Sequence, residues 1–184
     1  MSDLLARFTA TAVPLMRNIY GAALRMSGRP DVAEDVTQET YLRAYRTFHG
    51  FEAGTDCKAW LFTIMHSVLI NRFKHEQRHP QSPLDDLPAE SILLAQSDPA
   101  IAAIIDGATS PAVEAAMKAL PDVFRTVVVL VDIEELTYDE TARVLDCPIG
   151  TVRSRLYRAR HLLFAALQDH AKQAGYAVEP ARRV

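Results

Sequence analysis

Hydrophobic residues recur at helical intervals along most of the chain, and prolines and glycines separate the repeats. In the first half the pattern predicts three helices. The first runs from about Asp3 to Met26 with a kink near Pro14, the second from about Asp31 to Phe48, and the third from about Cys57 to Arg78. The third helix is expected to bury an apolar stripe of Trp60, Ile64 and Val68, with Leu61 beside this stripe.

The second half predicts further helices and no sheet. One helix should follow Ser110-Pro111, and another should follow Pro121. The run Val127–Val131 fits a strand as well as a helix by periodicity, but no partner strand is evident, so we expect a helix. The predicted fold class is therefore all-α.

Residues 136–164 predict two helices around a tight turn. Thr137 and Glu140 have the spacing of a capping box, and the helix after them should turn Ala142 and Leu145 inward. The turn 146–150 should break that helix, because Pro148 disfavours helical geometry before it and Gly150 tolerates left-handed geometry. A second helix should start near Thr151 and bury the stripe Val152, Leu156, Ala159 and Leu163.

The opposite side of this second helix is basic. At about 100° per residue, Ser154, Tyr157, Arg158 and His161 face away from the stripe, and Arg153, Arg155 and Arg160 flank them. Residues 150–161 hold four arginines and no acid, whereas residues 118–146 hold three basic and seven acidic residues. A solvated basic face would also give this pattern. The helix-turn-helix spacing favours a helix that enters a groove of DNA, where arginine can bridge guanine or hold phosphate.

These residues carry a family resemblance. The segment LTYDETARVLDCPIGTVRSRLYRAR resembles the −35-reading domain of bacterial RNA polymerase sigma factors of the extracytoplasmic-function class, and ALPDVFRTVVVLVDIEE looks like its first half. The resemblance covers residues 10–172. It implies a non-enzymatic subunit without a cofactor that binds core RNA polymerase and directs initiation at promoters. It also implies a set of −35 contacts: Arg153, Ser154, Arg155, Tyr157, Arg158 and Arg160. We expect Arg155 and Arg160 to hold phosphates, since both lie nearer the stripe.

A polar face continues along the second predicted helix. Acids in its first turn would complement the helix dipole, which accounts for Glu34 and Asp35 but not for the polar positions beyond them. The matching segment of sigma factors grips core polymerase. The resemblance therefore implies core contacts at Asp35, Gln38, Glu39 and Arg43.

The segment 51–78 is aromatic and basic together, as binding of unpaired bases requires. We interpret Trp60 as a core residue. In sigma factors the matching helix and the loop before it read and open the −10 element. The implied contacts lie in the loop Gly54–Lys58 and at Lys58, Asn71, Arg72, Lys74 and His75. Ser67 and Asn71 depart from the commonest residues of the family, Asn and Asp.

The same segment contains an H-E-x-x-H pattern, from His75 to His79, which is the signature of zinc proteases. Pro80 follows at once and basic residues surround the pattern, so we predict no metal site. No other catalytic set is evident. Cys57 and Cys147 lie in different halves, which indicates no disulfide framework and fits a reducing cytoplasm; a redox role for either stays open.

Charge and length suggest two domains. The chain has 184 residues and a net charge of −3, and residues 80–110 hold five acids and no base. We predict a core- and −10-binding domain at 1–79, a linker at 80–110, a helix-turn-helix domain at 111–174 and a tail at 175–184. No apolar run approaches the ~20 residues that span a bilayer, and no signal peptide is evident.

Two further expectations concern partners. The family resemblance implies an anti-sigma protein, often zinc-containing, that holds the chain inactive. The alternative function is a stand-alone helix-turn-helix regulator whose N-terminal domain senses a ligand or dimerises. Such a regulator would bind operator DNA tightly alone, whereas a sigma factor would co-purify with polymerase.

Overall fold

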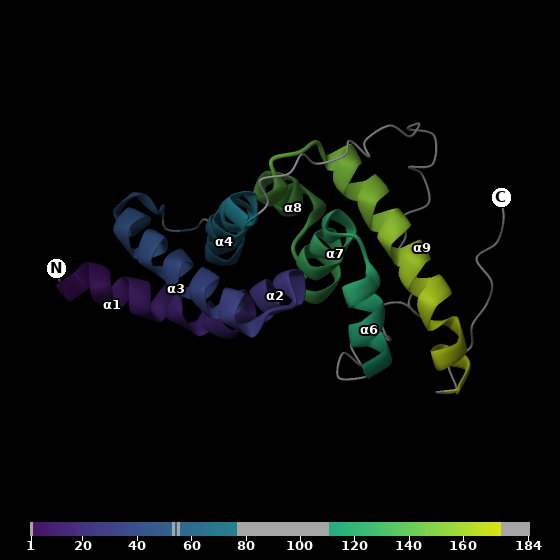
Figure 1. Cartoon of the computed structure of the whole chain (residues 1–184). Helices are drawn as coiled ribbons and strands as arrows, with labels where there is room; N and C mark the ends of the chain where they lie inside the picture. Colours follow the sequence, from purple (N-terminus) through teal and green to yellow (C-terminus); the bar gives the residue numbers. More distant parts are fainter. Residues whose placement is uncertain (1, 53, 55, 77–110, 174–184) are drawn as a thin grey trace.

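The computed structural model describes residues 2–52, 54, 56–76 and 111–173. Within these ranges every regular element is a helix, which confirms the predicted all-α class (Figure 1). The predicted linker 80–110 and tail 175–184 lie outside the described residues.

The N-terminal half has four α-helices, α1 (Ser2–Thr11), α2 (Met16–Ser27), α3 (Pro30–Thr47) and α4 (Cys57–Glu76). A 3-10 turn, Val13–Leu15, separates α1 from α2 at the predicted kink, because Pro14 cannot donate a helical hydrogen bond. Gly28 ends α2 in left-handed geometry, with φ at 68°, and its amide bonds the carbonyl of Leu24.

Helix α4 buries its predicted stripe only in part. Val68 and the neighbouring Leu61 are buried as predicted, and Phe62, Met65 and Leu69 are buried with them. Trp60 and Ile64 are only half-buried at the edge of the core. Apolar residues occupy nearly every side of α4, since both halves of the molecule pack against it, so its sequence does not define a single stripe.

The C-terminal half contains α6 (Pro111–Ala119), α7 (Asp122–Val128), α8 (Tyr138–Leu145) and α9 (Ile149–Gln173). The run Val127–Val131 is helical as predicted, but α7 widens into a π-helical turn over Val129–Ile133. The amide of Glu134 bonds the carbonyl of Val129 at 2.9 Å, and this wider turn presents Asp132 and Glu134 to neighbouring helices.

The capping box at the start of α8 is confirmed. The Thr137 hydroxyl accepts the Glu140 amide at 3.2 Å, and the Glu140 carboxylate accepts the Thr137 amide at 2.8 Å. The buried residues of α8 are Thr141 and Val144, not the predicted Ala142 and Leu145, which are half-buried.

The turn between α8 and α9 differs from the prediction in one detail. Asp146, with φ at 49°, takes the left-handed position, while Gly150 already lies in the first turn of α9. Asp tolerates this geometry because its short side chain can bond nearby backbone groups. The predicted stripe of α9 is confirmed, since all four of its residues are at most 2% exposed: Val152, Leu156, Ala159 and Leu163.

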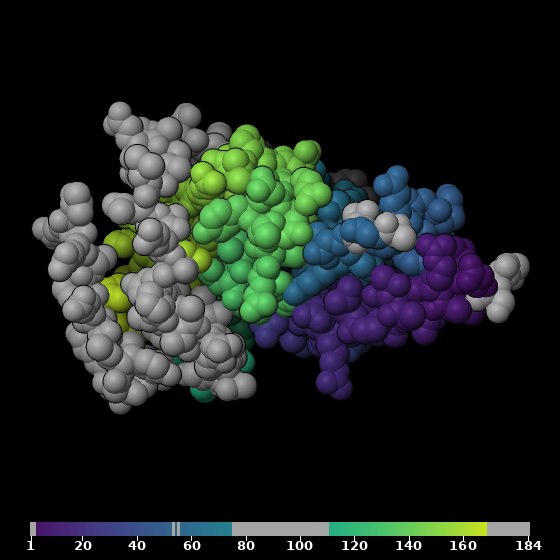
Figure 2. Space-filling view, turned by 180° about the vertical axis from the view of Figure 1, so that it is seen from behind, coloured from purple at the N-terminus to yellow at the C-terminus, as the bar shows by residue number. Residues whose placement is uncertain are grey.

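The two halves pack against each other. Helix α4 contacts α8, and α2 contacts α7 and the π-helical turn (Figure 1). The space-filling view shows the green surface of the C-terminal half directly against the blue and purple surfaces of the N-terminal half (Figure 2).

Candidate nucleic-acid and polymerase interfaces

The outer face of α9 carries the polar residues predicted to read DNA. Arg153 and Tyr157 are exposed, whereas Ser154 and Arg158 are half-buried. The guanidinium of Arg153 lies 5.8 Å from the ring centroid of Tyr138, a cation–π contact between α9 and α8. The Ser154 hydroxyl donates to the Thr151 carbonyl at 3.0 Å. The buried stripe on the other side fixes the rotation of the helix, so this face points to solvent.

Arg160 has a different environment from its neighbours. Its Nε atom lies 3.2 Å from one carboxylate oxygen of Asp132, and its second terminal nitrogen bonds the other oxygen. The two side chains are 12% and 9% exposed. Burial lowers the pKa of the Arg160 guanidinium, but the hydrogen bond and the charge attraction to Asp132, together with Tyr138, outweigh burial and raise it. Arg155 is half-buried and lines a cavity between the two halves.

A groove of about 780 Å³ lies between α3 and α4. All four residues predicted to contact core polymerase line its α3 side: Asp35, Gln38, Glu39 and Arg43. Its α4 side carries three residues predicted to contact the −10 element: Asn71, Arg72 and Lys74. Ion pairs cross and border the groove, with Arg72 to Asp35 at 2.8 Å and Arg43 to Glu39 at 2.6 Å. The structure thus brings together two residue sets that the sequence assigned to different partners.

Lys58 lies apart from this groove, at the first turn of α4. The Asp56 carboxylate caps that turn by accepting the amides of Lys58 and Ala59, at 2.7 and 3.2 Å. The Lys58 ammonium group reaches the C-terminal half, where it bonds the carbonyl of Glu134 and lies 3.3 Å from its carboxylate. The side chain of His75, the remaining residue of the predicted −10 set, is outside the described part.

The aromatic side chains near this end of α4 form a cluster. Phe51 stacks on Phe48 at 5.4 Å between centroids, and Trp60 lies 4.9 Å from Phe51. Phe62 is fully buried, so it cannot stack on a base. Trp60 packs against this cluster at the edge of the core, in keeping with its interpretation as a packing residue.

Comparison with known proteins identifies the family. The model of Sigma-70 region 2 matches residues 14–79, and that of Sigma-70 region 4 matches residues 110–163. The RNA polymerase sigma-H factor of Pseudomonas aeruginosa is 30% identical over 174 residues, which cover 91% of this chain and 89% of that protein. The chain is an extracytoplasmic-function sigma factor of the sigma-70 family. Sigma factors are the promoter-directing, DNA-recognising subunits of RNA polymerase.

Other relatives agree with this family. SigW of Bacillus subtilis is 32% identical to this chain, and the matched residues cover 83% of the length of SigW. SigE of Mycolicibacterium smegmatis is 34% identical, but this chain spans only 59% of its length. Among solved structures, the sigma factor RpoE in complex with the anti-sigma factor NepR from Bartonella quintana has a TM-score of 0.67. It is 23% identical, with 91% of this chain and 98% of that chain covered, which shows a shared fold.

The H-E-x-x-H pattern lies outside the described part of the sigma factor, because the side chains of His75 and Glu76 and all of residues 77–79 fall there. Among the described residues no three His, Cys, Asp or Glu side chains gather to hold a metal ion. No helix in the same ranges has the length and apolar character to cross a membrane.

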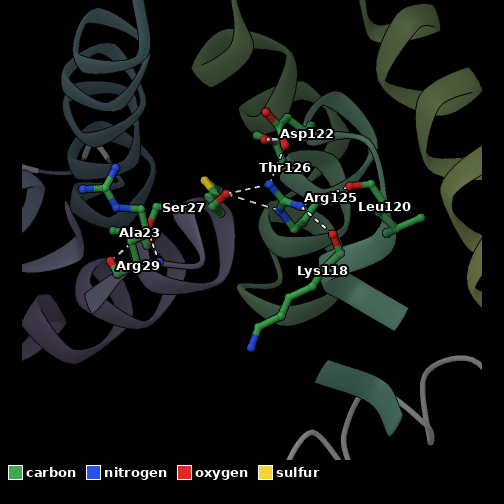
Figure 3. Close-up of polar contacts among 9 residues, drawn as sticks. Ala23, Ser27, Arg29, Lys118, Leu120, Asp122, Arg125 and Thr126 are labelled. Atoms are coloured by element: carbon green, nitrogen blue, oxygen red, sulfur yellow. Dashed lines mark hydrogen bonds and ion pairs between the residues drawn. The ribbon is translucent and has the colours of Figure 1, made fainter. Parts of the chain in front are cut away.

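Sequence reasoning missed the residues that join the two halves. Asn18 of α2 donates to the Glu134 carboxylate at 2.8 Å, and His66 of α4 lines the cavity between the halves. Arg125 of α7 donates to the Met26 carbonyl at 2.9 and 3.2 Å, in addition to carbonyls of its own half and Asp122 (Figure 3). The acidic residues of the segment 132–140 indicated polar contacts, but the sequence did not indicate which residues of the N-terminal half they contact.

Proposed function

We propose that this sigma factor binds core RNA polymerase through the groove between α3 and α4, and reads duplex −35 DNA with the outer face of α9. The observation that carries the proposal is the rotation of α9, whose buried stripe leaves Arg153 and Tyr157 exposed and Arg158 half-buried on the opposite side. Arginine can bridge guanine acceptors in the major groove. Arg160 is better assigned to internal packing than to phosphate, because Asp132 already neutralises it.

Lys58, Asn71, Lys74 and His75 are proposed to contact melted −10 DNA. Arg72 is instead a candidate to orient Asp35 for core binding, since the two side chains are paired across the groove. We also propose domain boundaries at 1–79 and 111–174 with a linker between them. The sigma factor acts beside polymerase in the cytoplasm, with no cofactor and no catalytic reaction of its own.

An anti-sigma protein is proposed as a further partner. One solved structure that resembles this chain contains an anti-sigma factor, the RpoE–NepR complex, and a second one holds CnrH in complex with the cytosolic domain of CnrY. Zinc binding by such a partner remains an implication of the family resemblance. A stand-alone regulator is disfavoured, because the chain matches both the region 2 and the region 4 models.

Base reading can be tested by transcription from a library of −35 variants at two salt concentrations, using core polymerase and the purified sigma factor. Arg158→Ala should relax selectivity at one position of the −35 element, at a cost of ~1–3 kcal/mol, because it removes a base contact. Transcription without a change in the rank order of the library would show that Arg158 does not read bases. Failure of the unaltered chain to direct any initiation would reject the sigma function.

Core binding has its own test. Charge reversal at Asp35 combined with Gln38→Ala should abolish pull-down of core polymerase while circular dichroism stays unchanged. The matched control is Asp31→Lys, which reverses an exposed acid at the start of the same helix, outside the groove. Equal loss of binding in both variants would point to net charge and not to the groove.

A further inference from the structure

Glu134 is a buried acid whose partners come from the other half of the molecule. Its side chain is 4% exposed. Within the described residues its carboxylate has two polar partners, Asn18 at 2.8 Å and Lys58 at 3.3 Å, and both belong to the N-terminal half. A carboxylate removed from water is costly unless it is paired and hydrogen-bonded. The buried state of Glu134 therefore depends on the two halves being docked.

Lys58 uses its ammonium group in the same contact. It donates to the main-chain carbonyl of Glu134 and lies 3.3 Å from its carboxylate, so the ammonium group points into the interface. A phosphate of DNA would need the same group. Docking of the halves and a DNA contact by Lys58 therefore compete for this ammonium group.

Other contacts strengthen the docked arrangement. The Arg125 guanidinium donates twice to the Met26 carbonyl, which lies near the end of α2 (Figure 3). Apolar side chains on both sides, including Leu69, Phe73 and Leu145, line the space between the halves. The docked state is thus held by several weak contacts around one buried ion pair.

We propose that Glu134 is an intramolecular latch that holds the free sigma factor closed and keeps Lys58 from promoter DNA. The proposal rests on the −10 role assigned to Lys58 above. Because coupling between two binding equilibria is reciprocal, opening the latch favours DNA binding and DNA binding favours opening. Once core polymerase separates the halves, the latch has no further effect.

The direct test is the affinity of the free chain for a single-stranded −10 oligonucleotide, measured by fluorescence anisotropy. Glu134→Gln should raise the affinity by about fivefold or more, the lower end of usual coupling. The control is Glu135→Gln, which removes the same charge at the next position, where the side chain is exposed. Equal affinities of the two variants would overturn the latch.

Small-angle scattering tests the docking without DNA. Glu134→Gln should increase the radius of gyration, and Glu135→Gln should not. Asn18→Asp is a second variant from the other side of the interface. It places a carboxylate where the 2.8 Å hydrogen bond now lies, and repulsion from Glu134 should expand the chain. A radius of gyration unchanged in both Glu134→Gln and Asn18→Asp would also overturn the proposal.

Transcription separates this inference from the proposed function. With saturating core polymerase, Glu134→Gln should initiate as well as the unaltered chain. If no chain initiates while Glu134→Gln still expands the molecule, the promoter role is wrong and the latch between the halves stands. If all chains initiate and Glu134→Gln changes neither affinity nor size, the sigma function stands and the latch is wrong.

Discussion

The ion pair between Arg160 and Asp132 joins α9 to the π-helical turn that precedes α8. Both side chains are nearly buried, and the guanidinium makes two bonds to the carboxylate. Such a pair is a weak source of net stability, because desolvation opposes the attraction. Removing one partner is different, since the remaining charge stays buried without compensation.

We therefore expect Arg160→Ala to destabilise the sigma factor by about 3–5 kcal/mol, because it strands the Asp132 carboxylate. Urea denaturation followed by circular dichroism measures this. Arg153→Ala, an exposed arginine of the same helix, should cost at most about 1 kcal/mol, because it loses only an exposed cation–π contact with Tyr138. A double change of Arg160 and Asp132 to leucine should recover most of the loss. Equal stability of Arg160→Ala and Arg153→Ala would contradict the assignment.

Position on the helix predicted only part of this outcome. Arg160 flanks the apolar stripe, and that placement suggested a phosphate contact at the edge of the DNA-reading face. The acid that neutralises it stands 28 positions earlier, on a turn whose π-helical geometry has no local sequence signature. For Ser154, Tyr157 and Arg158, which have no such acid beside them in the described structure, position sufficed to place them on the outer face.

Among the elements, α8 depends on its cap. It has only eight residues, and helices so short are marginal without packing or capping. Thr137 and Glu140 satisfy each other's amides at its start, and the helix in turn supports α9.

Thr137→Ala should cost about 1 kcal/mol of unfolding free energy, because one amide at the helix start loses its acceptor. The matched control is Thr63→Ala in α4, an exposed threonine whose hydroxyl only bonds back to the Ala59 carbonyl. That change should be neutral or slightly stabilising, since alanine is the better helix former. Thermal denaturation of both variants measures these changes in unfolding free energy. A loss of stability in Thr63→Ala as large as in Thr137→Ala would argue against a stabilising role of the cap.

The buried face of α9 was predicted well, whereas the buried faces of α4 and α8, which pack on several sides, were predicted only in part or not at all. The stripe of α9 and the capping box of α8 follow from spacing alone. In α4 the residues Phe62, Met65 and Leu69 are also buried, and Trp60 and Ile64 are only half-buried, because both faces have neighbours. For the same reason the groove that joins Asp35 to Arg72 was not foreseen, since it depends on how α3 and α4 pack.

At the scale of the whole molecule, the docking of the two halves is the feature that sequence patterns could not supply. Asn18 and Glu134 are 116 positions apart, and Lys58 and Glu134 are 76 apart. Each looks like an ordinary surface residue in its own segment, because pairing across an interface leaves no periodic signal. The family resemblance predicted two domains but said nothing of their contact.

His66 makes this docking sensitive to pH. Its side chain lines a cavity of about 520 Å³ between the halves. Burial lowers the pKa of the imidazole, although the backbone of Val144 opposes the shift. The charged residues around the same cavity are Lys74, Asp122 and Arg155. Two of the three are cationic, so a protonated ring would find little compensation there.

The separated form of the chain therefore binds protons more readily than the docked form. An exposed histidine has a pKa of about 6.5, and the docked value lies below it. Docking should be fully present above the exposed value and should weaken as pH falls through it toward the docked value, by at most about 1.4 kcal/mol per pH unit. The radius of gyration should accordingly increase between about pH 7.5 and pH 5. His66→Asn keeps a polar side chain at this position but cannot titrate, so the radius of gyration of this variant should depend less on pH. His161→Gln, an exposed histidine of α9, should behave like the unaltered chain. If His66→Asn and His161→Gln expanded equally on acidification, the pH dependence would belong to other groups.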